Sequence, residues 1–124
     1  MEPSVTDEQQ SRFAPALERL AGDHELLVEM AWMVKDDVPG LLQELDEELE
    51  AKCLEDAAAT LHKLKGMFST FETGAPVNEM PEWIRAAREG NFEQTVRLKK
   101  QIEPRLKRLY GEIQQLAVSS QSSA

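Results

Sequence analysis

The stretch EDAAATLHKLKGMFSTF, residues 55–71, decides the fold. Its large apolar residues recur at intervals of three and four, which is the period of an amphipathic helix. They are Leu61, Leu64, Phe68 and Phe71. At about 100° per residue, these side chains cluster within roughly 80° and define a buried side, and His62 points about 140° away from their centre. We therefore predict a helix that packs through one side and presents His62 to solvent.

Small side chains surround His62 on the side of this helix that we expect to face solvent. They are Ala58, Ala59, Gly66 and Ser69. A glycine in a helix interior costs about 1 kcal/mol relative to alanine, so Gly66 calls for a reason, and close approach by another molecule is one. Lys65 lies three positions after His62, where helix side chains meet, and a cation there can stabilise a phosphoryl group on the ring. The residue pattern alone is also compatible with His62 being an ordinary surface histidine without a function.

Helical periodicity continues on both sides of this stretch, and strand signals are nearly absent. The expected helices cover residues 7–21, 23–52, 54–72, 81–90 and 91–116. Thr6 is the expected N-cap of the first helix, Asp23 of the second and Asn91 of the last. Helices of this length joined by short connections favour antiparallel neighbours. The chain therefore predicts an all-α bundle.

Two prolines lie inside the expected helices. Pro39 has no N–H to donate to the carbonyl of Lys35, so we expect a kink in the second helix, with two separate helices as the alternative. Pro104 should bend the last helix for the same reason. The Ser-rich tail, residues 117–124, is expected to be disordered.

The composition limits the kinds of partner and the compartment. The chain has 124 residues and a net charge of −9, which argues against nucleic acid because a phosphate backbone attracts Lys and Arg. Apolar runs are short and the N-terminus lacks the pattern of a signal peptide, so we expect neither a membrane span nor secretion. Cys53, the lone cysteine, suits a reducing compartment. Together these features predict a cytoplasmic protein.

Charge is unevenly distributed along the chain. Residues 1–60 contain 16 acidic and 4 basic side chains, whereas residues 61–124 contain 7 acidic and 10 basic ones. The first interpretation is an acidic, solvated face on the early helices. The second is functional, because a basic second half favours an acidic partner surface or a phosphate.

The segment His62-Lys63-Leu64-Lys65-Gly66 resembles the His-x-Leu-Lys-Gly signature of histidine-containing phosphotransfer (HPt) domains. Three further features are similar to that family: Gly22-Asp23 before the second helix, Asp36-Asp37-x-Pro39 within it, and Gly74-Ala75 after the signature helix. The resemblance covers roughly residues 14–116, nearly the whole domain.

The resemblance implies an up-down four-helix bundle with an additional N-terminal helix packed across the bundle end. In this scheme residues 1–13 belong in part to the capping helix and residues 14–116 form the bundle domain. It implies that His62 accepts a phosphoryl group from a receiver-domain aspartate and passes it to another receiver, with Lys65 stabilising the phosphoryl group. The chain itself would be a phosphoryl carrier without turnover chemistry and without a bound cofactor or metal.

The partners implied by the resemblance are response-regulator receiver domains and a hybrid sensor histidine kinase. The receiver would contribute the Mg²⁺ and the acidic pocket. The docking surface would comprise Ala58, Ala59, Gly66, Met67 and Ser69, and the protein would act as a monomer. Met67 and Phe68 follow the signature where small residues are usual in the family, although Phe68 fits the core stripe. The spacing from His62 to Gly74 is about two residues longer than usual in the family that the chain resembles.

These departures motivate a second function, a helical adaptor that binds receivers or kinases without carrying phosphate. A third possibility is a dimeric phosphotransferase resembling the dimerisation domain of a histidine kinase, which would require dimers in solution.

Several other residues are of types that can carry a function. His24 lies next to an expected N-cap, and Cys53 lacks a neighbouring activating residue, so both are expected to have no catalytic role. Trp32, Trp83 and Leu26 are expected in the core. Met33 is expected either in the core or in an exposed patch beside the His62 face, where a receiver helix could pack.

Overall fold

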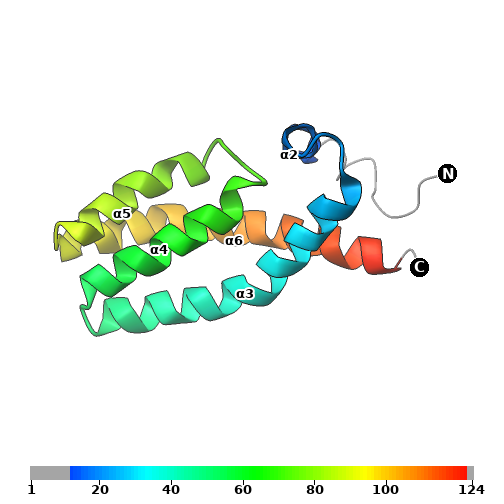
Figure 1. Cartoon of the computed structure of the whole chain (residues 1–124). Helices are drawn as coiled ribbons and strands as arrows, with labels where there is room; N and C mark the ends of the chain where they lie inside the picture. Colours follow the sequence, from blue (N-terminus) through cyan, green and yellow to red (C-terminus); the bar gives the residue numbers. More distant parts are fainter. Residues whose placement is uncertain (1–11, 123–124) are drawn as a thin grey trace.

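The computed structural model describes residues 12–122, and these residues form five α-helices, one short 3₁₀ helix and no strand (Figure 1). The elements in chain order are α2 (Ala14–Arg19), α3 (His24–Glu50), α4 (Leu54–Ser69), η1 (Val77–Glu79), α5 (Met80–Arg88) and α6 (Phe92–Ser122). The prediction of an all-α fold is confirmed. The proposed N-cap Thr6 lies outside the described residues.

The four longer helices α3, α4, α5 and α6 run alternately up and down, and together they form a bundle (Figure 1). Each packs against the next helix in the chain, and α6 closes the array by packing against α3. The α4 helix therefore has neighbours on two sides, α3 and α5. Its remaining side faces solvent.

The short helix α2 lies crosswise at the end of the bundle, near the start of α3 (Figure 1). Phe13, directly before α2, is fully buried and meets the ring of Phe71 edge-on with 5.5 Å between ring centroids. Arg12 forms a 2.9 Å ion pair with Glu72, and the Arg19 guanidinium donates to the carbonyl oxygen of Thr70 at 2.6 Å. These contacts attach α2 to the segment that follows α4.

Two of the expected helix caps are present. The Asp23 carboxylate accepts a 3.0 Å hydrogen bond from the backbone N–H of Leu26 at the start of α3. The Asn91 side chain accepts from the backbone N–H of Gln94 at 3.1 Å at the start of α6. Each cap satisfies an N–H that the helix itself cannot pair.

Pro39 lies inside α3, which continues through it to Glu50 and changes direction partway along (Figure 1). The two-helix alternative is therefore wrong. The carbonyl of Lys35, which Pro39 cannot pair, instead accepts a 2.9 Å hydrogen bond from the hydroxyl of Tyr110 on α6. A side chain from the neighbouring helix thus replaces the missing hydrogen bond.

The core runs along the centre of the bundle and includes the apolar stripe predicted for α4. Leu61, Leu64, Phe68 and Phe71 are all buried, as is Trp83 on α5. Trp32 is only partly buried and lies under the ammonium of Lys35 at 5.0 Å from its ring centroid.

Two expectations about the chain are wrong. Residues 117–122 do not form the expected disordered tail, because α6 continues to Ser122 and Ala117 is fully buried against the core; residues 123–124 lie outside the described residues. Leu26 is not a core residue, since it lies in the first turn of α3 and 38% of it is exposed.

Candidate functional site

His62 lies in the middle of α4, on the side that neither α3 nor α5 covers. Its imidazole is exposed, as the helical period predicted. Within residues 12–122, no hydrogen bond or ion pair holds the ring. The ring is therefore accessible to a reactant, and α4 fixes its position through the buried stripe on the opposite side.

Lys65 lies one turn further along α4 on the same side as His62. It is partly buried, which is the usual arrangement for a lysine whose stem packs on the helix surface while the ammonium stays in water. No carboxylate in the described part of the chain pairs with this ammonium. Its positive charge is therefore available to an anionic group on the imidazole.

Only some of the small residues expected around His62 are exposed. Ala59 and Gly66 are exposed, and a Cβ built on Gly66 would meet no atom within 4 Å. Ser69 is partly buried, and its hydroxyl donates to the carbonyl oxygen of Lys65 at 2.5 Å. The open surface next to the imidazole is thus formed mainly by Ala59 and Gly66.

The expectation that Ala58 belongs to this exposed surface is wrong, because Ala58 is only 2% exposed. The apolar stripe used to define the buried side contains only large residues. Since α4 packs against both α3 and α5, its buried side is wider than that stripe and also includes Ala57 and Thr60. The period of the large apolar residues does not reveal that a small residue is buried between two packed helices.

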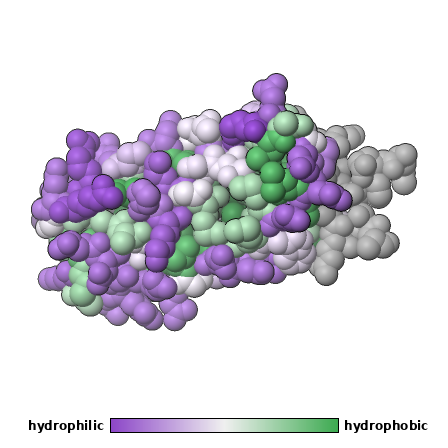
Figure 2. Space-filling model, in the orientation of Figure 1, coloured by the Kyte–Doolittle hydropathy of each residue, from purple (hydrophilic) through white to green (hydrophobic). Residues whose placement is uncertain are grey.

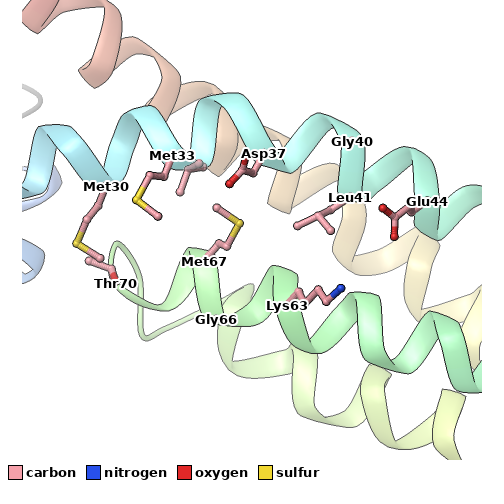
Figure 3. Close-up of a pocket in the computed structure, with 11 residues that line it drawn as sticks. Met30, Met33, Asp37, Gly40, Leu41, Glu44, Lys63, Gly66, Met67 and Thr70 are labelled. Atoms are coloured by element: carbon pink, nitrogen blue, oxygen red, sulfur yellow. The ribbon is translucent and has the colours of Figure 1, made fainter.

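A groove of about 690 Å³ lies beside the His62 surface, between α3 and α4 (Figure 3). Met67 and Gly66 line it from α4, and Met30, Met33 and Gly40 line it from α3. Met33 is 57% exposed, which resolves its position as surface rather than core. In the view of Figure 2, pale and green surfaces lie between hydrophilic ones across the face that carries α3 and α4.

Sequence reasoning identified Met67 and Gly66 and kept Met33 as a candidate for an exposed patch beside His62, but it did not place Met30 or Gly40 in the groove. The signal that was available is the apolar stripe beside the main one on α3, where Met30 and Met33 lie three residues apart. The period shows that these residues share a side of the helix. It does not show which helix stands opposite.

The remaining candidates lie away from His62. His24 is exposed in the first turn of α3, and Cys53 is the exposed N-cap residue of α4, at the opposite end of that helix from Ser69. Neither is brought to the imidazole by the fold. Among residues 12–122, no three His, Cys, Asp or Glu side chains are grouped so that they could hold a metal ion.

Comparison with known proteins defines the class of the chain. The family model of the Hpt domain matches residues 29–117, well over half of the sequence, so the chain belongs to the Hpt domain family. No curated protein and no solved structure matches it. The match spans α3 beyond its first turn, all of α4 and α5, and most of α6, and so includes His62 and the groove.

Membership in this family gives the chain a phosphotransfer role in two-component signalling, as a carrier module that interacts with receiver domains or kinases. None of the helices formed by residues 12–122 is both long enough and apolar enough to cross a membrane.

Proposed function

We propose that His62 is the phosphoacceptor of this chain, which receives a phosphoryl group from a receiver-domain aspartate and transfers it to another receiver. The observation that carries the proposal is the position of His62, an exposed imidazole without a partner in the described chain, inside a His-x-Leu-Lys-Gly segment. A neutral imidazole nitrogen with its lone pair directed to solvent is a competent nucleophile.

The transfer step needs one bond to form and one to break. An imidazole nitrogen of His62 attacks the phosphorus of the aspartyl phosphate, the bond from phosphorus to the carboxylate oxygen breaks, and the aspartate leaves as a free carboxylate. The reverse sequence delivers the phosphoryl group to the next receiver. Lys65, one turn away, stabilises the negative oxygens of the phosphohistidine.

The partner domain completes the site. A receiver with Mg²⁺ in an acidic pocket supplies the metal ion, while this chain binds no cofactor and acts as a monomer. A response-regulator receiver and a hybrid sensor histidine kinase are the partners. Ala59, Gly66, Met67 and Ser69 form the part of the docking surface next to His62.

The direct test is phosphoryl transfer from a panel of phosphorylated receiver domains to the purified chain. The chain should acquire an acid-labile, base-stable phosphate, and His62→Gln should remove it completely. Label that persists in His62→Gln would show that the phosphate lies elsewhere and would overturn the assignment.

The groove beside His62 supports a second candidate function, an adaptor that binds receivers or kinases without carrying phosphate. In that case signalling in cells would be unchanged by His62→Gln but lost with Gly66→Arg or Ala59→Arg, which place a large charged side chain on the exposed surface. Loss of signalling with His62→Gln favours the carrier instead.

A further inference from the structure

The outward side of α6 is basic, although the chain as a whole carries a net charge of −9. Its cations form two rows, because residues seven or eleven positions apart lie on nearly the same side of a helix. Arg97 and Arg108 form one row, Lys100 and Lys107 form the other, and all four residues are exposed. We call these four residues the basic strip.

No carboxylate of α6 lies among the cations of the basic strip. Between the two arginines the helix has one acidic residue, Glu103, and it is buried. Its carboxylate pairs with Lys99 at 2.9 Å and lies 3.9 Å from the ammonium of Lys107. The other three cations of the strip form no ion pair within residues 12–122. Their charges are therefore available to another molecule.

Arg108 differs from the two other arginines that line a cleft beside α6. The cleft has a volume of about 230 Å³, and Arg12, Arg105 and Arg108 all contribute to its lining. Arg12 pairs with Glu112 at 3.2 Å, and the guanidinium of Arg105 donates two hydrogen bonds to the carboxylate of Glu79. Arg108 remains unpaired although carboxylates lie nearby. Its guanidinium can therefore accept an acidic group from outside the chain.

Carboxylates border the basic strip on both flanks. On the flank toward α3, the side chain of Asp46 lies 3.5 Å from Lys99 and is 59% exposed. On the flank toward η1 and α2, the side chains of Glu79 and Glu112 are 40% and 43% exposed. A DNA duplex or an anionic membrane presents negative charge over a surface wider than the roughly 10 Å of one helix, and would meet these carboxylates. The narrow strip therefore favours a single acidic protein segment.

The helices α4 and α6 occupy opposite corners of the bundle (Figure 1). Each of them packs against α3 and α5, and the side left uncovered points away from these neighbours. The uncovered side of α4 carries His62, and the uncovered side of α6 carries the basic strip. A molecule bound to the strip therefore leaves the imidazole accessible.

We propose that the basic strip binds an acidic segment of a second protein while His62 remains free for phosphoryl transfer. A helical segment fits when two acidic residues eleven positions apart meet the arginines and two that are seven apart meet the lysines. These spacings correspond to about 16 and 10 Å along a helix. At physiological ionic strength, charges more than about 8 Å apart are largely screened, so the local cations determine what binds here. This partner is additional to the receivers of the proposed function and does not compete with them for His62.

The first experiment measures the binding of two helical peptides to the ¹⁵N-labelled full chain by NMR. One peptide has four glutamates with the same spacing as the cations of the strip, and the other has the same four glutamates distributed around the helix. At physiological ionic strength the first peptide should shift signals of residues 97–108 and bind at least fivefold more tightly. Equal binding of both peptides, or shifts that lie outside α6, would overturn the inference.

The second experiment separates the strip from the total charge of the chain. Arg97→Gln/Arg108→Gln removes one row of the strip, and Arg85→Gln/Arg88→Gln removes the same charge from exposed positions on α5. The first double variant should bind the patterned peptide at least fivefold more weakly, and the second should bind it within twofold of wild type. An equal loss in both variants would mean that only net charge matters and would refute the strip as a site.

The third experiment tests whether His62 stays accessible when the strip is occupied. Phosphoramidate phosphorylates imidazole directly with release of ammonia, and it should label His62 at one rate with and without saturating peptide. A slower rate with peptide would place the peptide over the imidazole and contradict the inference. Labelling of His62→Gln would instead contradict the proposed function and leave the strip unaffected.

Three other occupants of the basic strip have distinct signatures. A DNA duplex that binds more tightly than the patterned peptide, and loses affinity in Arg97→Gln/Arg108→Gln, would assign the strip to nucleic acid. The same result with vesicles containing phosphatidylserine would assign it to a membrane surface. Wild-type oligomers in sedimentation that this double variant dissociates would assign it to a second copy of the chain. Each of these results overturns the proposal of an acidic protein segment.

Discussion

At the scale of single residues, Lys65 offers a test of how the fold supports the phosphohistidine. Its ammonium has no carboxylate partner in the described chain and lies one turn from His62. Lys65→Met keeps the apolar stem and removes the charge, so we expect transfer to His62 to slow about tenfold, as for loss of one charge-assisted hydrogen bond. Assays of transfer from a phosphorylated receiver, quenched at successive times, measure this rate.

The matched control keeps the charge. Lys65→Arg should retain most of the transfer rate, and thermal unfolding of both variants should match wild type. A rate for Lys65→Met equal to wild type would show that the cation does not contact the phosphoryl group.

The exposure of His62 could be predicted from the sequence because one helix period, anchored by four large apolar residues, determines which side is buried. The burial of Ala58 could not, because it depends on α5 packing beside α4. Small residues fit either a helix interface or an exposed surface. Only the position of the neighbouring helix separates the two.

At the scale of elements, Tyr110 replaces the hydrogen bond that Pro39 removes from α3. Its hydroxyl donates to the Lys35 carbonyl at 2.9 Å, and Tyr110→Phe removes this donor with little change in shape. We expect the free energy of unfolding to fall by about 1 kcal/mol, as for one ordinary hydrogen bond. Urea denaturation measures this change, and an unchanged midpoint would mean that water pairs the carbonyl equally well.

Because of the same hydroxyl, we expect the stability of the fold to depend on pH in the alkaline range. Burial, together with the nearby carboxylate of Asp36, raises the pKa of Tyr110 above its usual value of 10.0. A raised pKa in the folded state gives stability that is complete below the unfolded pKa and is lost as the pH rises through the folded pKa. Wild type should therefore lose stability more steeply than Tyr110→Phe above about pH 10. Parallel slopes in denaturation series across this range would contradict the prediction.

The helix caps and the groove show which features of the helices could be predicted from the sequence. Asp23 and Asn91 could be identified as caps because a cap is a local interaction between a side chain and an N–H three residues later. The Tyr110–Lys35 hydrogen bond could not be predicted, because it joins residues far apart in the chain. On the α3 side of the groove, the sequence left Met33 between core and an exposed patch for the same reason. Their partners depend on which helices become neighbours.

At the scale of the whole molecule, the bundle separates the reactive residue from the parts that hold the chain together. His62, Ala59 and Gly66 occupy the uncovered side of α4, and the groove lies directly beside them. The stabilising contacts lie in the core and at the end where α2 crosses. Changes at that end should therefore alter stability and leave the reactivity of the imidazole unaffected.

Phe13 is the residue that tests this separation. It is 1% exposed, contacts Phe71 edge-on, and joins α2 to the end of the bundle. Phe13→Ala leaves a cavity there, so we expect a loss of about 3 kcal/mol in the free energy of unfolding. Phe92→Ala, at a half-buried position in the first turn of α6, is the matched control and should cost less. Below the unfolding transition, the rate at which phosphoramidate labels His62 should be the same in both variants and in wild type. A changed rate in Phe13→Ala would mean that α2 also positions α4, since Phe71 and Thr70 directly follow the helix that carries His62.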